Sequence, residues 1–277
     1  MSEKLTLPPH EYPDTANMIL EDDTPLDSFI DEKQQRLLTT VFYSGAEIPI
    51  NVPFIVAANV GLFSDVRDSG IVPDVFLSLN IIGTEEWSKG NIRSYLLWEF
   101  GKPPDVVIEI VSPTPGNELG SKLIDYAKLS VPYYVVYDPL KKLSQTPLQI
   151  FRLYGSYYLP KNDAWFADIN LGLTLWDGVF ENLNSTWLRW CDQSGNVIKK
   201  GDEIAAEKNQ EISQKDIQIK QALLLAVEVG LKFKFSDEYV GLLSDISQID
   251  DLKLLEAIAS QIPQISSTDE LRELYSQ

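Results

Sequence analysis

The strongest constraint on the fold is a change of hydrophobic period between residues 105 and 137. Asp105–Val111 is an almost unbroken apolar run, which is typical of a strand buried on both faces. Residues 117–129 then place apolar side chains at helical spacing, and residues 131–137 return to the pattern of a buried strand. Such a strand–helix–strand unit normally brings its second strand back parallel to the first in the same sheet. The sequence therefore predicts an α/β core at this point.

The segments before this unit predict one helix and three strands. A helix is expected from about residue 28 to residue 43, because Asp27 or Ser28 can cap it. Its expected apolar face consists of Phe29, Leu37 and Val41, with Ile30 and Leu38 as further candidates. Strand-like segments rich in β-branched and aromatic residues follow at 51–63, 72–79 and 92–100. After the core, hairpins are expected at 148–159 and at 186–199.

Composition divides the chain into three parts. Residues 1–27 form an acidic irregular arm, and residues 28–200 form the α/β (α+β) domain. Residues 201–277 contain no Trp and form a helical extension, with one long helix expected from about 202 to 231 and smaller helices from 237 onward. The extension offers amphipathic spacing without converging chemical groups, which favours a partner-binding or homodimerisation segment over a site.

The scarcity of histidine and cysteine excludes two large classes of site. His10 is the only histidine and lies in the Pro-rich arm, while Cys191 is the only cysteine. Ser–His–Asp and Cys–His catalysis require a positioned imidazole, and structural zinc requires several His or Cys ligands. Catalysis here would have to use carboxylates, lysine, hydroxyl groups or a hard metal ion.

The same features indicate the compartment. A lone cysteine cannot form an intrachain disulfide, which fits a reducing environment. Residues 1–12 lack the apolar core of a signal peptide, and the longest apolar stretches are shorter than the roughly 20 residues that span a bilayer. We therefore expect a cytoplasmic protein without a membrane partner.

Glu109 is the most conspicuous candidate for a functional residue. It interrupts the apolar run 105–111, where an ionised carboxylate is costly unless it is paired or binds a metal. Strand alternation places it on one face with Val107 and Val111. Two interpretations remain open: a core glutamate satisfied by a Lys or Arg, for which Arg93 is a candidate, or a metal ligand.

Asp74 strengthens the second interpretation. Alone, it is a common kind of strand-entry aspartate after a proline, here Pro73. On neighbouring strands of one sheet, however, Asp74 and Glu109 can converge on one Mg²⁺, which is held by one or two carboxylates plus water and substrate phosphate. A site of this kind can hydrolyse a phosphodiester without histidine.

Lys122 is the third candidate. It lies on the helix that follows the Glu109 strand, from which it can reach back to the strand ends. There it could orient the attacking water or stabilise developing negative charge. The alternative is a solvated lysine paired with Glu118 or Asp125 on its own helix.

Four segments together resemble one known family. They are Ile71-Val72-Pro73-Asp74, Glu109–Pro113, Gly120–Tyr126 and Val131–Pro139. They are similar to the restriction endonuclease family often called Uma-two-like, of the PD-(D/E)XK nuclease superfamily, over roughly residues 28–190. The resemblance implies a core of one helix, three strands, a helix and a strand.

The resemblance also implies an activity and a ligand set. The activity is hydrolysis of DNA phosphodiester bonds with Mg²⁺ or Mn²⁺, with Asp74, Glu109 and the backbone carbonyl of Ile110 as metal ligands. The superfamily lysine usually lies two residues after the glutamate, where this chain has Val111. Lys122 is the best-placed replacement, and Gln35 in the first helix is a further candidate neighbour of the site.

The net charge is the main argument against a nucleic-acid substrate. The chain carries 41 Asp and Glu against 23 Lys and Arg, a net of −18, whereas proteins that bind duplex DNA usually present a basic surface. Only −5 of this charge lies in residues 41–199, since residues 1–40 carry −6 and residues 200–277 carry −7. Within the core, Lys141-Lys142 and Lys199-Lys200 are the local basic clusters.

Two other functions remain open from the sequence. One is a non-catalytic interaction protein that retains a nuclease-like fold and binds partners through its helical tail. The other is a metal-dependent phosphohydrolase acting on a small nucleotide, which would tolerate the acidity better. The geometry around Glu109 is expected to separate the enzyme from the interaction protein. Asp74 and Glu109 carboxylates that can bridge one ion and are open to solvent favour the enzyme, whereas an Arg93–Glu109 pair filling that space favours the interaction protein.

Overall fold

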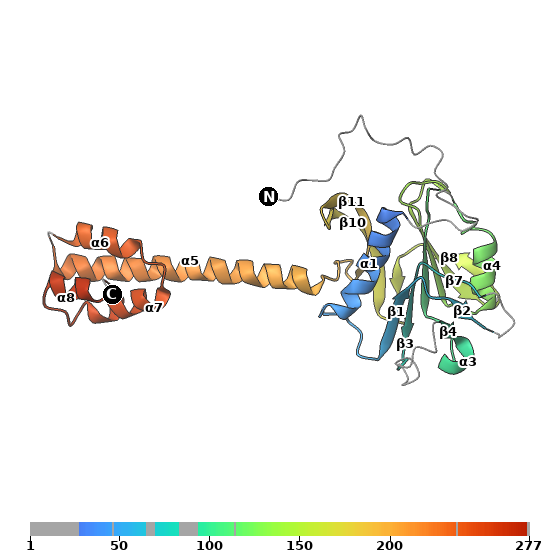
Figure 1. The fold of residues 1–277 in the computed structure, drawn as a ribbon, viewed down its shortest axis with the longest axis horizontal. Coiled ribbons are helices and arrows are strands. Elements are labelled where there is room, and N and C mark those ends of the chain that lie inside the picture. Colours follow the sequence, from blue (N-terminus) through green and yellow to red (C-terminus); the bar gives the residue numbers. More distant parts are fainter. Residues whose placement is uncertain are drawn as a thin grey trace, which may run out of the picture. The chain divides into compact units, whose positions relative to one another are not determined.

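The structure is a computed structural model that describes residues 28–45, 47–64, 70–82, 94–113, 115–236 and 238–275. The chain divides into two compact units, one ending at Gly201 and the other beginning at Asp202. Figure 1 shows the elements of each unit. The acidic arm predicted at residues 1–27 lies outside the described residues.

The first unit is built on a six-stranded mixed sheet with the order β1-β3-β5-β6-β7-β8. The strands are β1 (Phe54–Ala58), β3 (Val75–Leu79), β5 (Val106–Ile110), β6 (Tyr133–Tyr137), β7 (Leu148–Tyr154) and β8 (Tyr157–Pro160). Strands β5 and β6 are parallel and joined through helix α4 (Ser121–Lys128), while the other neighbours are antiparallel. The predicted strand–helix–strand unit and the 148–159 hairpin are confirmed.

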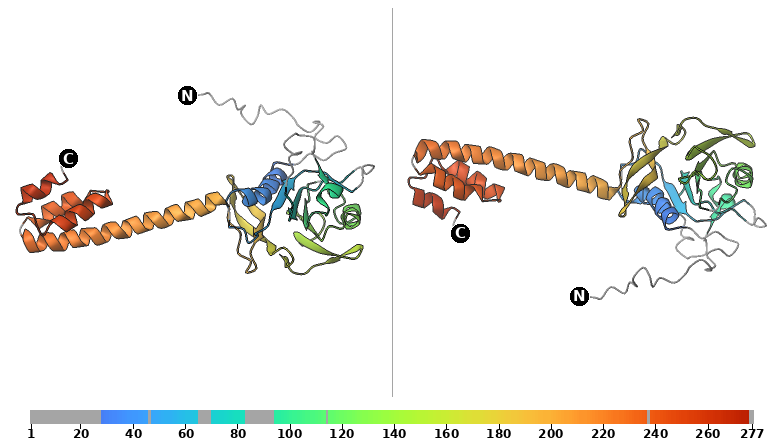
Figure 2. Two further views of the ribbon diagram at one scale, coloured as in Figure 1. Left: turned by 90° about the horizontal axis from the view of Figure 1, so that it is seen from below. Right: turned by 90° about the horizontal axis from the view of Figure 1, so that it is seen from above.

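Two apolar layers cover the sheet. On one face, helix α1 (Phe29–Tyr43) and a second, three-stranded sheet pack against side chains such as Val75 and Ile108. On the other face, α4 packs through Tyr126 and Ala127 against Val107. Figure 2 shows α1 and α4 on opposite sides of the sheet. The fold is therefore the mixed α/β architecture expected of a restriction-endonuclease-like core.

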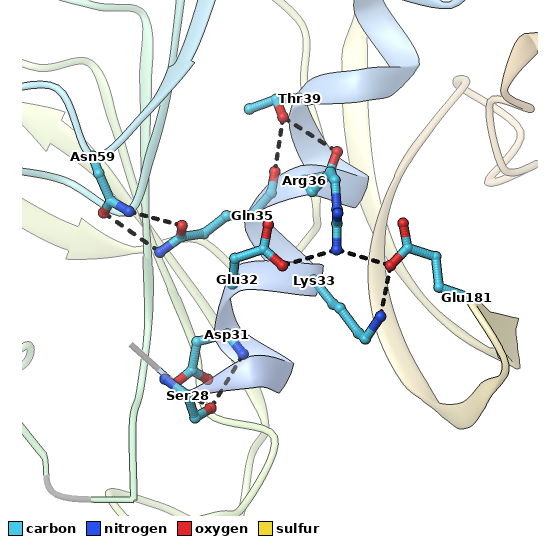
Figure 3. A network of polar contacts seen from close by, with 9 residues as sticks. All are labelled: Ser28, Asp31, Glu32, Lys33, Gln35, Arg36, Thr39, Asn59 and Glu181. Atoms are coloured by element: carbon cyan, nitrogen blue, oxygen red, sulfur yellow. Dashed lines mark hydrogen bonds and ion pairs between the residues drawn. The ribbon is translucent and has the colours of Figure 1, made fainter. Parts of the chain in front are cut away.

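Helix α1 begins where the sequence predicted it. Ser28 is the N-cap: its hydroxyl accepts a hydrogen bond from the Asp31 N–H at 3.2 Å, and the Asp31 carboxylate accepts one from the Ser28 N–H at 3.1 Å (Figure 3). The predicted apolar face is wrong at Phe29, which is 91% exposed, because it precedes the turns that contact the sheet. The buried apolar residues of the helix are Leu37, Leu38, Val41 and Phe42.

The segment 92–100 does not form the predicted strand. Residues 92–93 lie outside the described residues, the strand β4 covers only Tyr95–Leu96, and the chain continues as the one-turn helix α3 (Leu97–Phe100). Gly101 ends this helix in the left-handed conformation, with φ 72° and its N–H bonded to the Leu97 carbonyl at 2.8 Å. Strand β4 pairs in parallel with β2 (Leu62–Phe63) in a separate two-stranded sheet.

The segment predicted as one strand at 51–63 is split in two. Strands β1 and β2 belong to different sheets, and Asn59 between them has a φ of 54°. An extended strand cannot continue through that conformation, which asparagine tolerates better than most residues.

The hairpin predicted at 186–199 is present only in a short form. Residues 190–198 form one antiparallel bridge, between Cys191 and Val197, and the Ile198 N–H donates to the Trp190 carbonyl at 2.9 Å. The main partner of strand β11 (Leu183–Cys191) is β10 (Leu171–Phe180), along its whole length, and β9 (Trp165–Phe166) adds a third strand. The tight turn at Glu181-Asn182 has positive φ at both residues, as a two-residue hairpin with the strands' twist requires.

The second unit is helical. Helix α5 (Gly201–Lys234) is followed by α6 (Tyr239–Ser247), α7 (Leu252–Gln261) and α8 (Thr268–Glu273). Val227 and Leu231 of α5 pack with Leu242, Ile258 and Leu271 of the later helices in one apolar core. Among the described residues, none of the helices combines the length and the apolar character needed to cross a membrane.

Candidate active site

Strand register brings the predicted site residues to one edge of the six-stranded sheet. Ala58 lies opposite Val75, Val75 lies opposite Ile108, and Ile110 pairs with Tyr137. The end of β1, the start of β3, the end of β5 and the end of β6 therefore lie side by side, and the residues next to these strand ends share this edge. Asp74 and Glu109, 35 positions apart in the sequence, meet here.

Glu109 is buried and held from α4. Its side chain is 1% exposed, and Val107 and Val111 belong to the apolar cluster on its face, while Ile108 and Ile110 belong to the opposite cluster. Lys122 Nζ lies 2.8 Å from Glu109 Oε2. The hydroxyl of Tyr126, one turn further along α4, donates to Oε1 at 2.5 Å. One helix face thus supplies a partner to each oxygen of the carboxylate.

Lys122 lies closer to the helix start than the sequence indicated. The helix was expected from residue 117, but it begins at Ser121 because Asn117 has a φ of 69° and Gly120 is the N-cap. Lys122 is therefore in the first turn. The two alternative partners are engaged elsewhere: Glu118 accepts from the Gly116 N–H at 2.8 Å, and Asp125 pairs with Lys128 at 2.7 Å. Arg93, the other candidate partner of Glu109, lies outside the described residues.

Asp74 is held from two directions. The backbone N–H of Ile110 donates to Oδ2 at 2.6 Å, and the side-chain amide of Gln35 donates to Oδ1 at 3.2 Å. Asp74 also lies close enough to Glu109 to influence the pKa of the Glu109 carboxyl group. The two acidic groups therefore lie near each other at the end of β5.

Gln35 is itself oriented by Asn59. The Asn59 amide donates to the Gln35 side-chain carbonyl at 3.0 Å, and the Gln35 NH₂ group lies 3.5 Å from Asn59 Oδ1 (Figure 3). The same NH₂ group donates to Asp74 Oδ1 at 3.2 Å. Gln35 was a candidate from the sequence, whereas Asn59 was not. Nothing in the sequence marked Asn59 as a neighbour of the site, because its position and its positive φ depend on where β1 ends.

The electrostatics of the cluster favour a cation. Burial raises the pKa of Glu109 above its ordinary value, against the opposing effects of Lys122 and Tyr126. Burial lowers the pKa of Lys122 and the charge of Glu109 raises it, with a net upward shift, so the ammonium stays charged. Burial followed by the charge of Glu109 raises the pKa of Tyr126, which remains a hydrogen-bond donor. Two carboxyl groups thus share one ammonium in a buried setting.

This donor set fits a hard divalent cation. Mg²⁺ is typically held by one or two carboxylates together with water and substrate oxygens. The N–H and C=O groups of one strand residue point the same way, so the Ile110 carbonyl faces the side on which its N–H meets Asp74. Across the described residues there is no group of three or more His, Cys, Asp or Glu side chains that could hold a metal. A site here would therefore have two carboxylates and rely on backbone and solvent oxygens.

Comparison with known proteins assigns the family. Residues 10–171, more than half of the chain, match the model of the family Uma2, described as "Putative restriction endonuclease". The protein belongs to the Uma2 family. Neither the curated proteins nor the solved structures compared with the chain gave a match. The match supports a restriction-endonuclease-like nuclease and includes Asp74, Glu109 and Lys122, but not α5–α8.

The Uma2 match also bears on the position of the lysine. Val111, two residues after Glu109, is fully buried in the cluster on the α4 side of the sheet. In this Uma2 protein the ammonium group that contacts Glu109 comes instead from the first turn of α4. Tyr126, which sequence reasoning left without a role, lies four residues after Lys122 and therefore on the same helix face.

Proposed function

We propose that the protein is an endonuclease that hydrolyses DNA phosphodiester bonds with Mg²⁺ or Mn²⁺. The observation that carries the proposal is the convergence of three side chains: Asp74 binds the backbone N–H of Ile110, directly after Glu109, and Lys122 Nζ lies 2.8 Å from Glu109 Oε2. The Uma2 family supports nuclease activity, and the metal dependence and the site are our inference from the geometry.

In this proposal Asp74, Glu109 and the Ile110 carbonyl hold the cation. A bound divalent cation would neutralise charge on the phosphodiester and polarise it for attack by water. Asp74 is kept in place by the Ile110 N–H and by Gln35.

Lys122 has the second role. Its ammonium is held at the site by Glu109, and its upward pKa shift keeps it charged at neutral pH. A cation at this position can orient the attacking water and stabilise the negative charge that develops on the phosphate. Since it does not transfer a proton in this scheme, its charge rather than its acidity is the property that matters.

A non-catalytic interaction protein is the second candidate. The specific observation in its favour is that each oxygen of Glu109 already has a protein partner, Lys122 or Tyr126, as a structural core glutamate requires. Divalent-metal binding distinguishes the two functions, because only the nuclease needs Asp74 and Glu109 to accept a cation. A small-nucleotide phosphohydrolase would share the metal site but act on nucleotides and leave plasmid DNA intact.

The decisive experiment combines cleavage with metal binding. Supercoiled plasmid is incubated with the full-length protein and Mg²⁺ or Mn²⁺, beside Asp74→Asn and Glu109→Gln. We expect wild-type cleavage that requires the metal and is lost in both variants, with weaker Mn²⁺ binding by electron paramagnetic resonance. Cleavage that survives both substitutions would refute the site, and wild-type protein without cleavage or Mn²⁺ binding would favour the interaction protein.

We propose further that the protein forms a homodimer through α5 and acts in the cytoplasm. Residues spaced three and four apart along α5 form an exposed stripe, which consists of Ile219, Ala222, Ala226, Val229 and Phe233. Phe233 is 88% exposed and Ile219 is 48% exposed. Val227 and Leu231, on another face, already pack within the second unit. The spacing is that of a coiled-coil seam, so a second copy of α5 is the partner it fits.

A further inference from the structure

We propose that the loop from Asp138 to Ser144 binds the phosphate backbone of the nucleic-acid substrate through Lys141 and Lys142. This inference rests on the proposed function, since it identifies how DNA would be held beside the carboxylates of an otherwise acidic protein. It assigns a binding role to two side chains that the candidate active site does not use.

The loop begins at the edge of the sheet that carries the carboxylates. Strands β5 and β6 are parallel, Ile110 pairs with Tyr137, and the Val111 N–H donates to the Tyr137 carbonyl at 2.8 Å. Asp138 follows Tyr137 directly. Ile110 and Pro139 also line the same small cavity. Duplex DNA carries one negative charge for about every 1.7 Å of helix axis, so a strand bound at Glu109 brings further phosphates past this loop.

The loop has a fixed shape. The Asp138 carboxylate is fully buried and accepts from the backbone N–H groups of Lys142 at 2.8 Å and Leu143 at 2.7 Å. The Lys141 N–H also donates to the Asp138 carbonyl at 3.1 Å. The acidic group of the loop is therefore occupied by backbone donors and does not pair with either lysine side chain. A loop that is already ordered loses little conformational freedom when it binds.

The conformation of Lys141 is unusual for a lysine. Its φ of 52° lies in the left-handed region, which glycine and asparagine adopt more readily. Local backbone preference therefore does not explain a lysine at this position. Both Lys141 and Lys142 are exposed to solvent.

Elimination of the other cations points to the same pair. Seven lysines and arginines of the first unit form ion pairs: Lys33, Arg36, Lys102, Lys122, Lys128, Arg152 and Lys161. Three more have other contacts: Arg189 lies over Trp176, Lys200 lies over Phe180, and Lys199 has a further interaction. Within the residues of this unit that the structure describes, Lys141 and Lys142 are the two cations whose side chains form neither an ion pair nor a contact of these other kinds.

The test measures the salt dependence of DNA binding. A fluorescent duplex is titrated with full-length protein in EDTA, so that binding is observed without cleavage, over a series of NaCl concentrations. Each phosphate contact contributes about one to the slope of log K against log salt, so K141A/K142A should lower the slope by about two. K141R/K142R should keep the wild-type slope. K208A/K215A, which removes two exposed charges from α5, is the matched control and should also keep it.

Two results would overturn the inference. One is a K141A/K142A slope equal to that of wild type in protein whose melting temperature is unchanged, and the other is wild-type protein that does not bind the duplex at low salt. Failure of the proposed function looks different, because it is read from plasmid cleavage with Mg²⁺ in the wild-type protein. A reduced slope without any cleavage would support the loop and refute the nuclease.

Discussion

Lys122 Nζ lies 2.8 Å from Glu109 Oε2 and joins the first turn of α4 to the end of β5. The pair shows how the chain brings an ammonium group to its buried carboxylate although Val111 occupies the position two residues after the glutamate. Helix α4 connects β5 to β6, and its N-terminus lies at the edge of the sheet where β5 ends. A lysine in that first turn therefore reaches the strand end without entering the sheet.

The charge of Lys122 is the first property to test. We expect Lys122→Ala to lower the rate of plasmid cleavage by about 10²- to 10³-fold, the range found when one stabilising group is removed from a transition state. Mn²⁺ binding should persist, because Asp74 and Glu109 remain and face one cation fewer. The measurement is kcat beside Mn²⁺ affinity by electron paramagnetic resonance. Cleavage at the wild-type rate with unchanged metal binding would show that Lys122 has no catalytic role.

Tyr126 is expected to position Glu109. Tyr126→Phe keeps the buried ring and removes the hydroxyl that donates to Glu109 Oε1 at 2.5 Å. We expect weaker Mn²⁺ binding and a higher KM for the metal, because the carboxylate gains freedom to rotate. Tyr134→Phe is the matched control, since its buried hydroxyl donates to the Glu118 carbonyl at 2.9 Å. Equal effects of the two substitutions on metal affinity would contradict the assignment.

Substitutions of two neighbouring glutamines on α1, Gln34 and Gln35, should separate an effect on metal binding from an effect on stability. Gln35 donates to Asp74, whereas Gln34 bonds with both the N–H and the carbonyl of Leu188 at 2.9 Å. Gln35→Leu should weaken Mn²⁺ binding with little change in melting temperature. Gln34→Leu should leave two buried backbone groups unpaired and destabilise the fold by about 1–3 kcal/mol, without a change in metal affinity. The opposite pattern in calorimetry and metal titration would be inconsistent with the geometry.

The exposed face of α5 predicts an oligomeric state. Light scattering after size exclusion should give the mass of a dimer for the wild-type protein. I219K/F233K should give a monomer, because two charges would then be buried in the seam. Ile217 is also exposed, at 58%, but lies outside the stripe, so Ile217→Lys should remain dimeric. A monomeric wild-type protein would refute the dimer proposal and leave the nuclease site unaffected.

The N-cap of α1 makes a prediction about stability alone. Ser28→Ala removes the hydroxyl that accepts from the Asp31 N–H and opens the capping box. We expect a loss of about 1 kcal/mol in the free energy of unfolding, measured by urea denaturation. Ser28→Asp retains an acceptor at the N-cap and should recover most of the loss. An unchanged unfolding midpoint for Ser28→Ala would show that the cap does not contribute to stability.

Local patterns predicted the elements that depend on adjacent residues. The cap at Ser28, the β5–α4–β6 unit and the hairpin of β7 and β8 follow from capping chemistry, hydrophobic period and turn residues. The errors arise where a neighbour distant in sequence decides. The segment 92–100 keeps only the short strand β4, which pairs with β2 from a distant part of the chain.

For the site, the sequence by itself determined which chemistry is possible. One histidine and one cysteine leave carboxylates, lysine and a hard metal ion, and a glutamate inside an apolar strand marks the candidate site. The tertiary structure decided which groups meet: Glu109 contacts Lys122 and Tyr126, and Gln35 reaches Asp74. The physical reason is that residue type and period are local properties of the chain. The approach of Asp74 to the end of β5 depends instead on the register of separate strands, which only the packing of the whole sheet sets.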